Sequence, residues 1–299
     1  MFGLSIRHVL VALFALLLVA GPATAELRVV ATTNSLGMLA NEVGGDQVQV
    51  RVLAPPDRDV HYLDARPSYM AALRRAHLLL EMGAGLEEGW LPAAVQGAAN
   101  PAINQGRTGR LRAADHLELR QSVTAQGPHT GHVHAEGNPH FNADPRRMAR
   151  LALLVGERLA QLQPEHAERF KQRANVLAEQ LLAEAERLAG EVPQGRSFVA
   201  YHEDLDYLEE WLPVQVVGYL EPLPGIPPTA RHLNALTRRL DGQQGVVLYA
   251  VFQPERGARF LRDRIGWPGQ AVALEPAEPT LESYLSLLRS WAQALGSGA

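Results

Sequence analysis

Three histidines and one glutamate follow predicted β-strands and could together bind a metal ion. His61 and His140 lie in loops after strands of the N-terminal half, and His202 and Glu275 directly follow strands of the C-terminal half. Ligands of open α/β sheets bind outside the carboxyl ends of the strands, so all four side chains are expected on that side of their sheets. Three imidazoles and a carboxylate are donors that suit a tetrahedral Zn²⁺.

The spacing of these four residues forms no local motif. They are separated by 79, 62 and 73 positions, so only a tertiary fold could bring them together. Taken singly, a histidine after a strand is more often a hydrogen-bonded loop residue, and a glutamate is usually solvated. Position alone therefore makes the four residues candidates for metal ligands.

Composition narrows the chemistry further. The chain of 299 residues contains 11 histidines and no cysteine, which excludes disulfides, thiolate ligands, cysteine nucleophiles and a lipid anchor on cysteine. A transition metal would have to be bound by histidine and carboxylate. The content of 46% hydrophobic and 20% charged residues is ordinary for a globular protein, and the length suggests about two domains. A net charge of −4 without a basic cluster argues against a nucleic-acid partner.

Residues 1–25 have the pattern of a secretory signal peptide. Arg7 and His8 form a basic start, an apolar run follows over residues 9–20, and residues 23–25 form an A-x-A cleavage site. The apolar run is shorter than the ~20 residues that a spanning helix needs, which weighs against an uncleaved anchor. We expect cleavage after Ala25 and, without a lipid anchor, a protein that is free in the periplasm.

The hydrophobic pattern alternates between strands and helices in two stretches of the chain. In residues 26–163, strands are predicted at 27–32, 47–53, 77–82 and 111–119, and helices at 36–43, 67–75, 86–98 and 144–163. In residues 193–299, strands are predicted at 197–201, 214–220, 246–252 and 271–274, and helices at 204–211, 229–240, 255–265 and 281–295. This alternation predicts two α/β lobes with mostly parallel sheets.

A long helix is predicted over residues 164–192, between the two lobes. Its apolar residues from Phe170 to Leu188 recur every three or four positions and give one apolar stripe. At ~1.5 Å per residue, a helix of this length crosses a whole domain. We therefore expect a rigid helix that joins the lobe of residues 26–163 to the lobe of residues 193–299, with a cleft between the lobes.

Six short motifs, taken in their order along the chain, indicate a family. They are Asp59-Val60-His61 with Pro67-Ser68, GAGLEEGW at 83–90, Asn138-Pro139-His140 with Asp144-Pro145, VAYHEDLDY at 199–207, GIPP at 225–228 and FQPE at 252–255. Together they resemble the metal-binding substrate-binding proteins of ABC transporters, the zinc and manganese type (cluster A-I) that includes the zinc-uptake periplasmic proteins. The resemblance covers essentially the whole chain after the predicted signal peptide.

The resemblance implies a fold and a set of ligands. The fold would be two α/β lobes joined by a rigid helix, with the metal in the cleft between them. His61, His140 and His202 match the family's histidine ligands, and Glu275 stands where the family commonly has aspartate. Manganese-type members usually carry a carboxylate at the position of His202, so the histidine here favours Zn²⁺.

Two departures from the family pattern leave the fourth ligand open. Tyr69 stands where the family often has aspartate, and Glu275 is one methylene longer than the usual aspartate. The nearby carboxylates of Asp64, Glu203 and Glu278, or a water molecule, could take the fourth place instead of Glu275.

The loop of residues 121–143 contains three further histidines: His129, His132 and His134. Zinc-type members often carry a histidine-rich loop here, so the resemblance implies an accessory site that captures zinc or accepts it from a chaperone. The alternative is a solvated loop with incidental histidines, because three flexible imidazoles bind metal weakly without preorganisation.

The resemblance implies a periplasmic, monomeric zinc-binding protein that delivers Zn²⁺ to an inner-membrane ABC permease and catalyses no reaction. A periplasmic metallochaperone is a further possible partner. Three alternatives stay open at this point: a manganese, iron or nickel protein of the same class, a zinc chaperone without a transporter, and an exported zinc hydrolase. The hydrolase is the weakest of these, because the chain has neither an H-E-x-x-H motif nor a nucleophile elbow.

Overall fold

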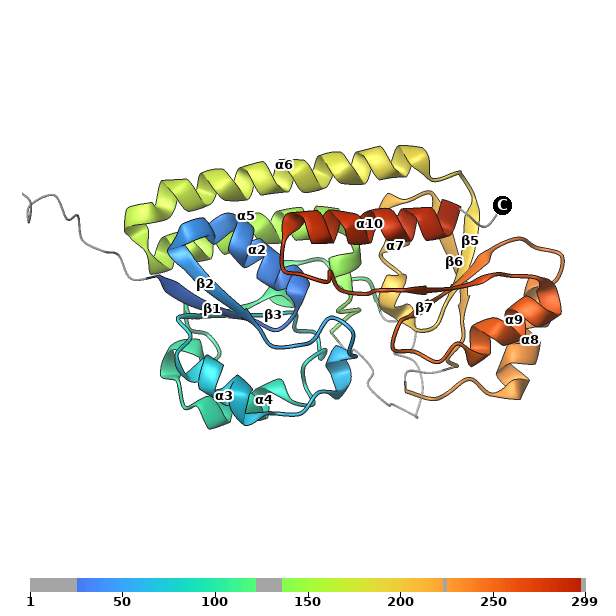
Figure 1. Cartoon of the computed structure of the whole chain (residues 1–299), viewed down its shortest axis with the longest axis horizontal. Helices are drawn as coiled ribbons and strands as arrows, with labels where there is room; N and C mark the ends of the chain where they lie inside the picture. The colour runs from blue at the N-terminus through green and yellow to red at the C-terminus, as the bar shows by residue number, and fades with distance from the viewer. Residues whose placement is uncertain (1–25, 122–135, 223–224, 297–299) are drawn as a thin grey trace, which may run out of the picture.

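The computed structural model describes residues 26–121, 136–222 and 225–296. The predicted signal peptide and the histidines His129, His132 and His134 therefore lie outside the described residues. Two α/β lobes lie side by side beneath one long helix (Figure 1). Each lobe is built on a four-stranded sheet in which every pair of neighbouring strands is parallel, as the alternating pattern predicts.

The sheet of the N-terminal lobe has the strand order β2-β1-β3-β4. Its strands are β1 (Leu27–Ala31), β2 (Val48–Val52), β3 (Leu78–Glu81) and β4 (Arg110–Arg112), and the helices between them are α2 (Asn34–Gly44), α3 (Pro67–Arg74) and α4 (Leu91–Ala98). The central strand β3 is buried at all four positions, which explains its unbroken apolar run before Glu81.

The sheet of the C-terminal lobe has the corresponding order β6-β5-β7-β8. Its strands are β5 (Arg196–Ala200), β6 (Val214–Tyr219), β7 (Val246–Ala250) and β8 (Gly269–Val272), and its helices are α7 (Leu208–Trp211), α8 (Ala230–Leu240), α9 (Arg256–Ile265) and α10 (Leu281–Gly296). In each sheet the chain adds strands first on one side and then on the other, and it changes side between β1 and β3 in one sheet and between β5 and β7 in the other. Ligands of such sheets bind at the carboxyl ends of the strands that flank this change.

Two antiparallel helices join the lobes. Helix α5 (Pro145–Leu162) begins at Asp144, whose side chain accepts a hydrogen bond from the Arg146 amide, and proline fits the first turn because it needs no amide donor. Helix α6 (Ala167–Glu191) follows a short 3-10 turn and extends over both lobes (Figure 1). The predicted apolar stripe of α6, from Phe170 to Leu188, is its buried face.

One predicted helix, at residues 86–98, begins only at Leu91. The carboxylate of Glu87 accepts hydrogen bonds from the backbone amides of Met82 and Gly83, at 2.7 and 3.0 Å, and so bends the chain back onto the end of β3. Gly83 has a φ of 83°, a conformation that glycine adopts readily. The buried carboxylate thus closes a tight loop at the end of β3, and residues 84–90 form turns before the helix begins.

The segment between β8 and α10 returns across the lobe boundary and lies along α2. The side-chain amides of Asn34 and Asn41 donate hydrogen bonds to the carbonyl oxygens of Pro276 and Pro279, both at 2.8 Å. A Cβ atom at Gly37 would lie 3.0 Å from the Cβ of Pro279 and 2.6 Å from a methyl of Val52, so glycine permits this close approach. The C-terminal lobe is thereby attached directly to the first helix of the N-terminal lobe.

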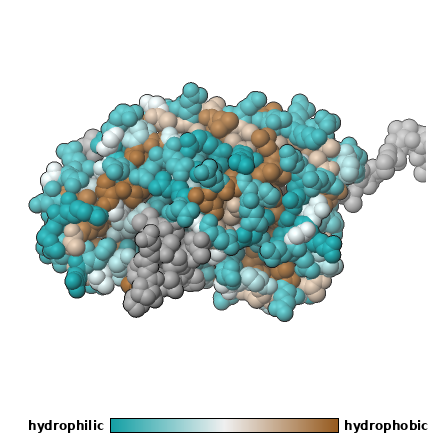
Figure 2. Space-filling model, turned by 180° about the vertical axis from the view of Figure 1, so that it is seen from behind, coloured by the Kyte–Doolittle hydropathy of each residue, from teal (hydrophilic) through white to brown (hydrophobic). Residues whose placement is uncertain are grey.

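The hydrophobic core continues from one lobe into the other. One cluster of buried side chains includes Val30 of the first sheet, Phe170 of α6, Phe198 of the second sheet and Trp291 of α10. On the face seen in Figure 2, hydrophobic residues are scattered among hydrophilic ones. Among the described residues, no helix is both long and apolar enough to span a bilayer.

A buried hydroxyl of α10 provides a test of how firmly the lobes are joined. Tyr284 is fully buried and donates a hydrogen bond of 2.7 Å to the carbonyl oxygen of Asn142 in the N-terminal lobe. Tyr284→Phe leaves that carbonyl without its donor, so we expect the free energy of unfolding to fall by about 1–3 kcal/mol. Chemical denaturation followed by circular dichroism measures the change.

The matched control is Tyr249→Phe on β7. Tyr249 is half-buried, and its hydroxyl makes no hydrogen bond to the residues that the structure describes. This variant is expected to change the free energy of unfolding by less than about 0.5 kcal/mol. An equal loss in both variants would show that the Tyr284–Asn142 bond does not hold the lobes together.

Candidate metal centre

His61 is oriented by its own turn. It lies in a 3-10 turn, Val60–Tyr62, and the side chain of Asp59 accepts hydrogen bonds from the His61 amide at 3.0 Å and from its Nδ1 at 2.7 Å. The indole nitrogen of Trp90 donates to the carbonyl oxygen of Val60 at 2.8 Å and fixes the turn against the lobe. With Nδ1 bound to Asp59, Nε2 is the nitrogen that His61 presents to an ion.

His140 is placed by contacts that cross the lobe boundary. The side-chain oxygen of Asn138 accepts a hydrogen bond from the His140 amide at 2.9 Å. The same side chain donates to the carbonyl oxygen of Glu203 at 2.8 Å, and the Tyr207 hydroxyl donates to the carbonyl oxygen of Asn138 at 2.7 Å. The loop that carries His140 is therefore bonded to the segment that follows His202.

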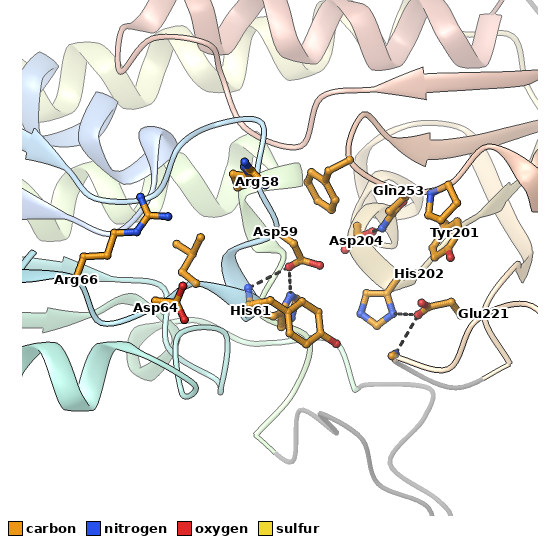
Figure 3. Close-up of a pocket in the computed structure, with 15 residues that line it drawn as sticks. Arg58, Asp59, His61, Asp64, Arg66, Tyr201, His202, Asp204, Glu221 and Gln253 are labelled. Carbon is orange, nitrogen blue, oxygen red and sulfur yellow. Dashed lines mark hydrogen bonds and ion pairs between the residues drawn. The ribbon is translucent and has the colours of Figure 1, made fainter.

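His202 follows β5 at its carboxyl end, as the sequence predicts. Its Nδ1 lies 3.5 Å from Oε2 of Glu221, a residue that follows β6 (Figure 3). A carboxylate oxygen thus faces Nδ1 in both histidines, that of Glu221 in His202 and that of Asp59 in His61. A carboxylate on Nδ1 orients the ring and makes Nε2 a better donor to a metal.

The structure brings the three predicted histidines together. One ring nitrogen of each of His61, His140 and His202 can be chosen so that the three atoms all lie within 4.8 Å of one another. The centroid of the His61 ring is 5.2 Å from that of His140 and 6.1 Å from that of His202, and the remaining pair is 5.7 Å apart. Two rings come from the N-terminal lobe and one from the C-terminal lobe, so a shared ion would lie between the lobes.

The surroundings of the three rings are electronegative. Burial alone would lower the pKa of His202, but the carboxylates of Asp204 and Glu221 outweigh it and raise that pKa to about 9. Burial tends to raise the pKa of Asp59, yet its hydrogen bond and charge interaction with His61 lower the pKa overall. These carboxylates favour positive charge at the centre of the site.

Glu275 lies close to the histidines, but its carboxylate is bound to other groups. Oε2 accepts a hydrogen bond from the Ser35 amide at 2.7 Å, and Oε1 accepts from the Ser35 hydroxyl at 3.0 Å and from the Asn142 side-chain amide at 3.1 Å. Burial is the main cause that raises the pKa of Glu275 to about 7. Glu275 lines a small cavity together with His61 and His140, and its role as a ligand stays a prediction.

A carboxylate that the sequence analysis did not select lies beside the three rings. Asp204 is 8% exposed, and its Oδ1 is 3.5 Å from Nε2 of His140. Of the alternatives named from the sequence, Asp64 lines the larger cavity described below, Glu203 is buried and Glu278 is exposed. Asp204 could have been noticed only as an acid two positions after His202, because nothing local shows where its side chain points.

Two of the three histidines, His61 and His202, line an open cavity of about 490 Å³ between the lobes (Figure 3), and His140 lines the small cavity next to Glu275. His61 and Asp64 line the open cavity from the N-terminal lobe, and His202, Glu221 and Gln253 line it from the C-terminal lobe.

Two parallel α/β lobes with a histidine cluster between them, joined by a long helix, define the class: a metal-binding substrate-binding protein, and not an enzyme. The chain belongs to the family described as "Zinc-uptake complex component A periplasmic", whose model matches residues 29–298. The alternative of an exported zinc hydrolase is thereby excluded.

The chain is also similar to individual proteins in sequence or in fold. The chain is 23% identical, over 249 residues that cover 78% of each protein, to a protein of Yersinia pestis named "High-affinity zinc uptake system protein ZnuA". A crystal structure of ZnuA matches with a TM-score of 0.74 and 20% identity, covering 91% of this chain and 99% of that one. The binding protein FpvC of Pseudomonas aeruginosa, solved with Mn²⁺, matches with a TM-score of 0.76 and 16% identity, covering 91% and 98%.

The charge state of His202 can be measured directly. In the metal-free protein, we expect its imidazole to titrate near the pKa of about 9 and to remain protonated at pH 7. Because this pKa lies above the ordinary value of 6.5, the imidazolium stabilises the metal-free fold fully below pH 6.5, and the contribution is lost as the pH rises through 9. Histidine NMR across this range follows the titration.

Removing the partner carboxylate provides the comparison. Glu221→Gln is expected to lower the pKa of His202, whereas Glu186→Gln, an exposed change on α6, should leave it unaltered. If His202 titrates at or below 6.5 in the unmodified protein, the carboxylates of Asp204 and Glu221 do not outweigh the effect of burial on its pKa.

Proposed function

We propose that this protein captures Zn²⁺ in the periplasm with His61, His140 and His202 and delivers it to an inner-membrane ABC permease. The observation that carries the proposal is the convergence of three imidazoles, from both lobes, to within 4.8 Å, two of which line a solvent-open cavity. Around a tetrahedral Zn²⁺, donor atoms at ~2.0–2.1 Å from the ion lie about 3.3 Å apart, so small side-chain rotations complete the site.

The choice of Zn²⁺ over other ions rests on the donor atoms. Imidazole suits Zn²⁺, whereas Mn²⁺ prefers carboxylate and water oxygens. The family supports zinc uptake, while FpvC has been solved with Mn²⁺ and with Ni²⁺. Three nitrogen donors favour Zn²⁺ here and place Mn²⁺ last among the candidates.

The periplasmic location and the permease partner follow from the family and from the predicted signal peptide of residues 1–25. The tightly connected lobes suit a protein that presents a loaded ion at an open cavity. Release is then a matter of competition for ligands, and a wide hinge opening is not required.

Alanine variants of the three histidines test the proposal. His61→Ala, His140→Ala and His202→Ala are each expected to weaken Zn²⁺ binding by at least about 100-fold, since each removes a donor atom. Competition with a chromophoric chelator, applied to the chain from Glu26 onward, measures the affinity. Titrations with Mn²⁺ and Ni²⁺ rank the ions.

The control is His116→Ala, a histidine of the N-terminal lobe that lies in a separate cavity beside Arg112 and Arg158. It should bind Zn²⁺ as the unmodified protein does. Unchanged affinity in all three site variants, or a preference for Mn²⁺ over Zn²⁺, would contradict the proposed function.

Acid should release the metal. Imidazole binds a metal only in its neutral form, so protons compete with Zn²⁺ for the same nitrogens. We expect the apparent affinity to fall at least tenfold for each unit of pH between 7 and 5, after correction for protonation of the competing chelator. An affinity that is constant over this range would rule out ligation by histidine.

A further inference from the structure

Three imidazoles leave one corner of a tetrahedral zinc site to be filled. We propose that Asp204 supplies this fourth donor, held in place by Gln253, and that Glu275 remains bound to Ser35. The inference rests on the proposed function, since it concerns the same ion, but it assigns a ligand that neither the sequence motifs nor the family comparison indicates. It makes the site a set of three nitrogens and one oxygen, drawn equally from the two lobes.

The distance between Asp204 and His140 fits two ligands of one ion. Oδ1 of Asp204 is 3.5 Å from Nε2 of His140. A charge-assisted hydrogen bond between such groups would measure about 2.7–2.9 Å, whereas two donors of a tetrahedral Zn²⁺ lie about 3.3 Å apart. The observed separation is therefore closer to that of ligands that share an ion.

The side chain of Asp204 also lies within the field of the other two histidines. Its carboxylate interacts electrostatically with both His202 and His61. Asp204 lines the small inner cavity with His61, His140 and Glu275, and it lines the open cavity with His202. Asp59 is the other carboxylate that lines both cavities, but its side chain is already hydrogen-bonded to the amide and Nδ1 of His61.

Gln253 fixes the orientation of the Asp204 carboxylate. The Gln253 side-chain oxygen accepts a hydrogen bond from the Ala250 amide at 2.7 Å, so its NH₂ group must point the other way. That NH₂ donates to Oδ2 of Asp204 at 2.8 Å. With Oδ2 held by Gln253 and Oδ1 turned toward His140, the carboxylate is positioned as an outer hydrogen-bond partner positions a metal ligand.

Glu275 is the competing carboxylate, and its interactions argue against it. Each of its oxygens accepts a hydrogen bond from Ser35, one from the amide and one from the hydroxyl. Ser35 lies in the first turn of α2. There the carboxylate accepts from an amide at the positive end of the helix, a favourable place for a negative charge. Both oxygens of Glu275 are thus already occupied by Ser35 and Asn142, whereas Oδ1 of Asp204 faces Nε2 of His140 at 3.5 Å.

The decisive experiment compares three amide substitutions that keep side-chain size: Asp204→Asn, Glu275→Gln and Asp206→Asn. We expect Asp204→Asn to weaken Zn²⁺ binding at least about tenfold and to alter the visible absorption of the Co²⁺-loaded protein, which reports the number and kind of ligands. Asp206→Asn is the matched control, because Asp206 is also buried, two positions further on, but its Oδ2 accepts a hydrogen bond from Tyr219 at 2.8 Å. It should leave both measurements unchanged.

The role of Gln253 has its own readout. Gln253→Leu is expected to weaken Zn²⁺ binding less than Asp204→Asn does, and to have no further effect when combined with Asp204→Asn. A merely structural role for Gln253 would give additive losses, so a non-additive pair supports positioning of the carboxylate.

The outcomes separate this inference from the proposed function. If Asp204→Asn keeps the Zn²⁺ affinity and the Co²⁺ spectrum while Glu275→Gln changes both, Glu275 is the fourth ligand and our inference is wrong. If neither substitution changes either measurement, the fourth ligand is water, and the inference is again overturned while zinc capture stands. Failure of the histidine variants to affect binding would instead remove the proposed function. Circular dichroism of each metal-free variant verifies that it is folded.

Discussion

Two sheets held at a constant separation are the condition on which the metal centre depends. His61 and His140 belong to one lobe and His202 to the other, and their rings can share one ion only if the carboxyl ends of the two sheets face each other at a set distance. Helix α6 spans both lobes, the segment before α10 is bonded to α2, and one hydrophobic cluster passes through the boundary. These connections resist both opening and sliding.

The contacts at the lobe boundary place the ligands as well as the lobes. Asn138 positions the backbone of His140 and, through its side-chain amide, bonds to the segment that follows His202. Because the same residue serves both purposes, a displacement of one lobe moves the imidazoles apart at once. The geometry of the three histidines therefore depends directly on the contact between the lobes.

Most carboxylates near the centre are of two kinds, and Asp204 differs from both. Asp59 and Glu221 face the Nδ1 atoms of His61 and His202, so they orient the rings and add negative charge without taking a place around the ion. Glu87 and Glu275 are buried carboxylates that accept backbone amide hydrogen bonds within the N-terminal lobe or across the boundary. Asp204 belongs to neither kind, since one of its oxygens faces a histidine nitrogen that could bind the metal.

The sequence alone predicted three features correctly: the alternation of strands and helices, the apolar stripe of α6, and the placement of His61 and His202 after strands. These features depend on local periodicity and on residues close together in the chain. Those features, with the ordered motifs, were enough to predict two parallel α/β lobes. Local periodicity did not show that residues 86–90 form turns, because it carries no sign that the Glu87 carboxylate accepts hydrogen bonds from the Met82 and Gly83 amides at the end of β3.

Only the tertiary structure decided which side chains meet. The separations of 79, 62 and 73 residues are closed by the packing of the lobes, and no local pattern encodes that distance. Asp204 is the clearest case, because its orientation depends on Gln253, which lies 49 positions away, and on the strand that fixes Gln253 in turn. Sequence types and periods determine the elements and the candidate donors, whereas long-range hydrogen bonds and core packing determine which donors face one point.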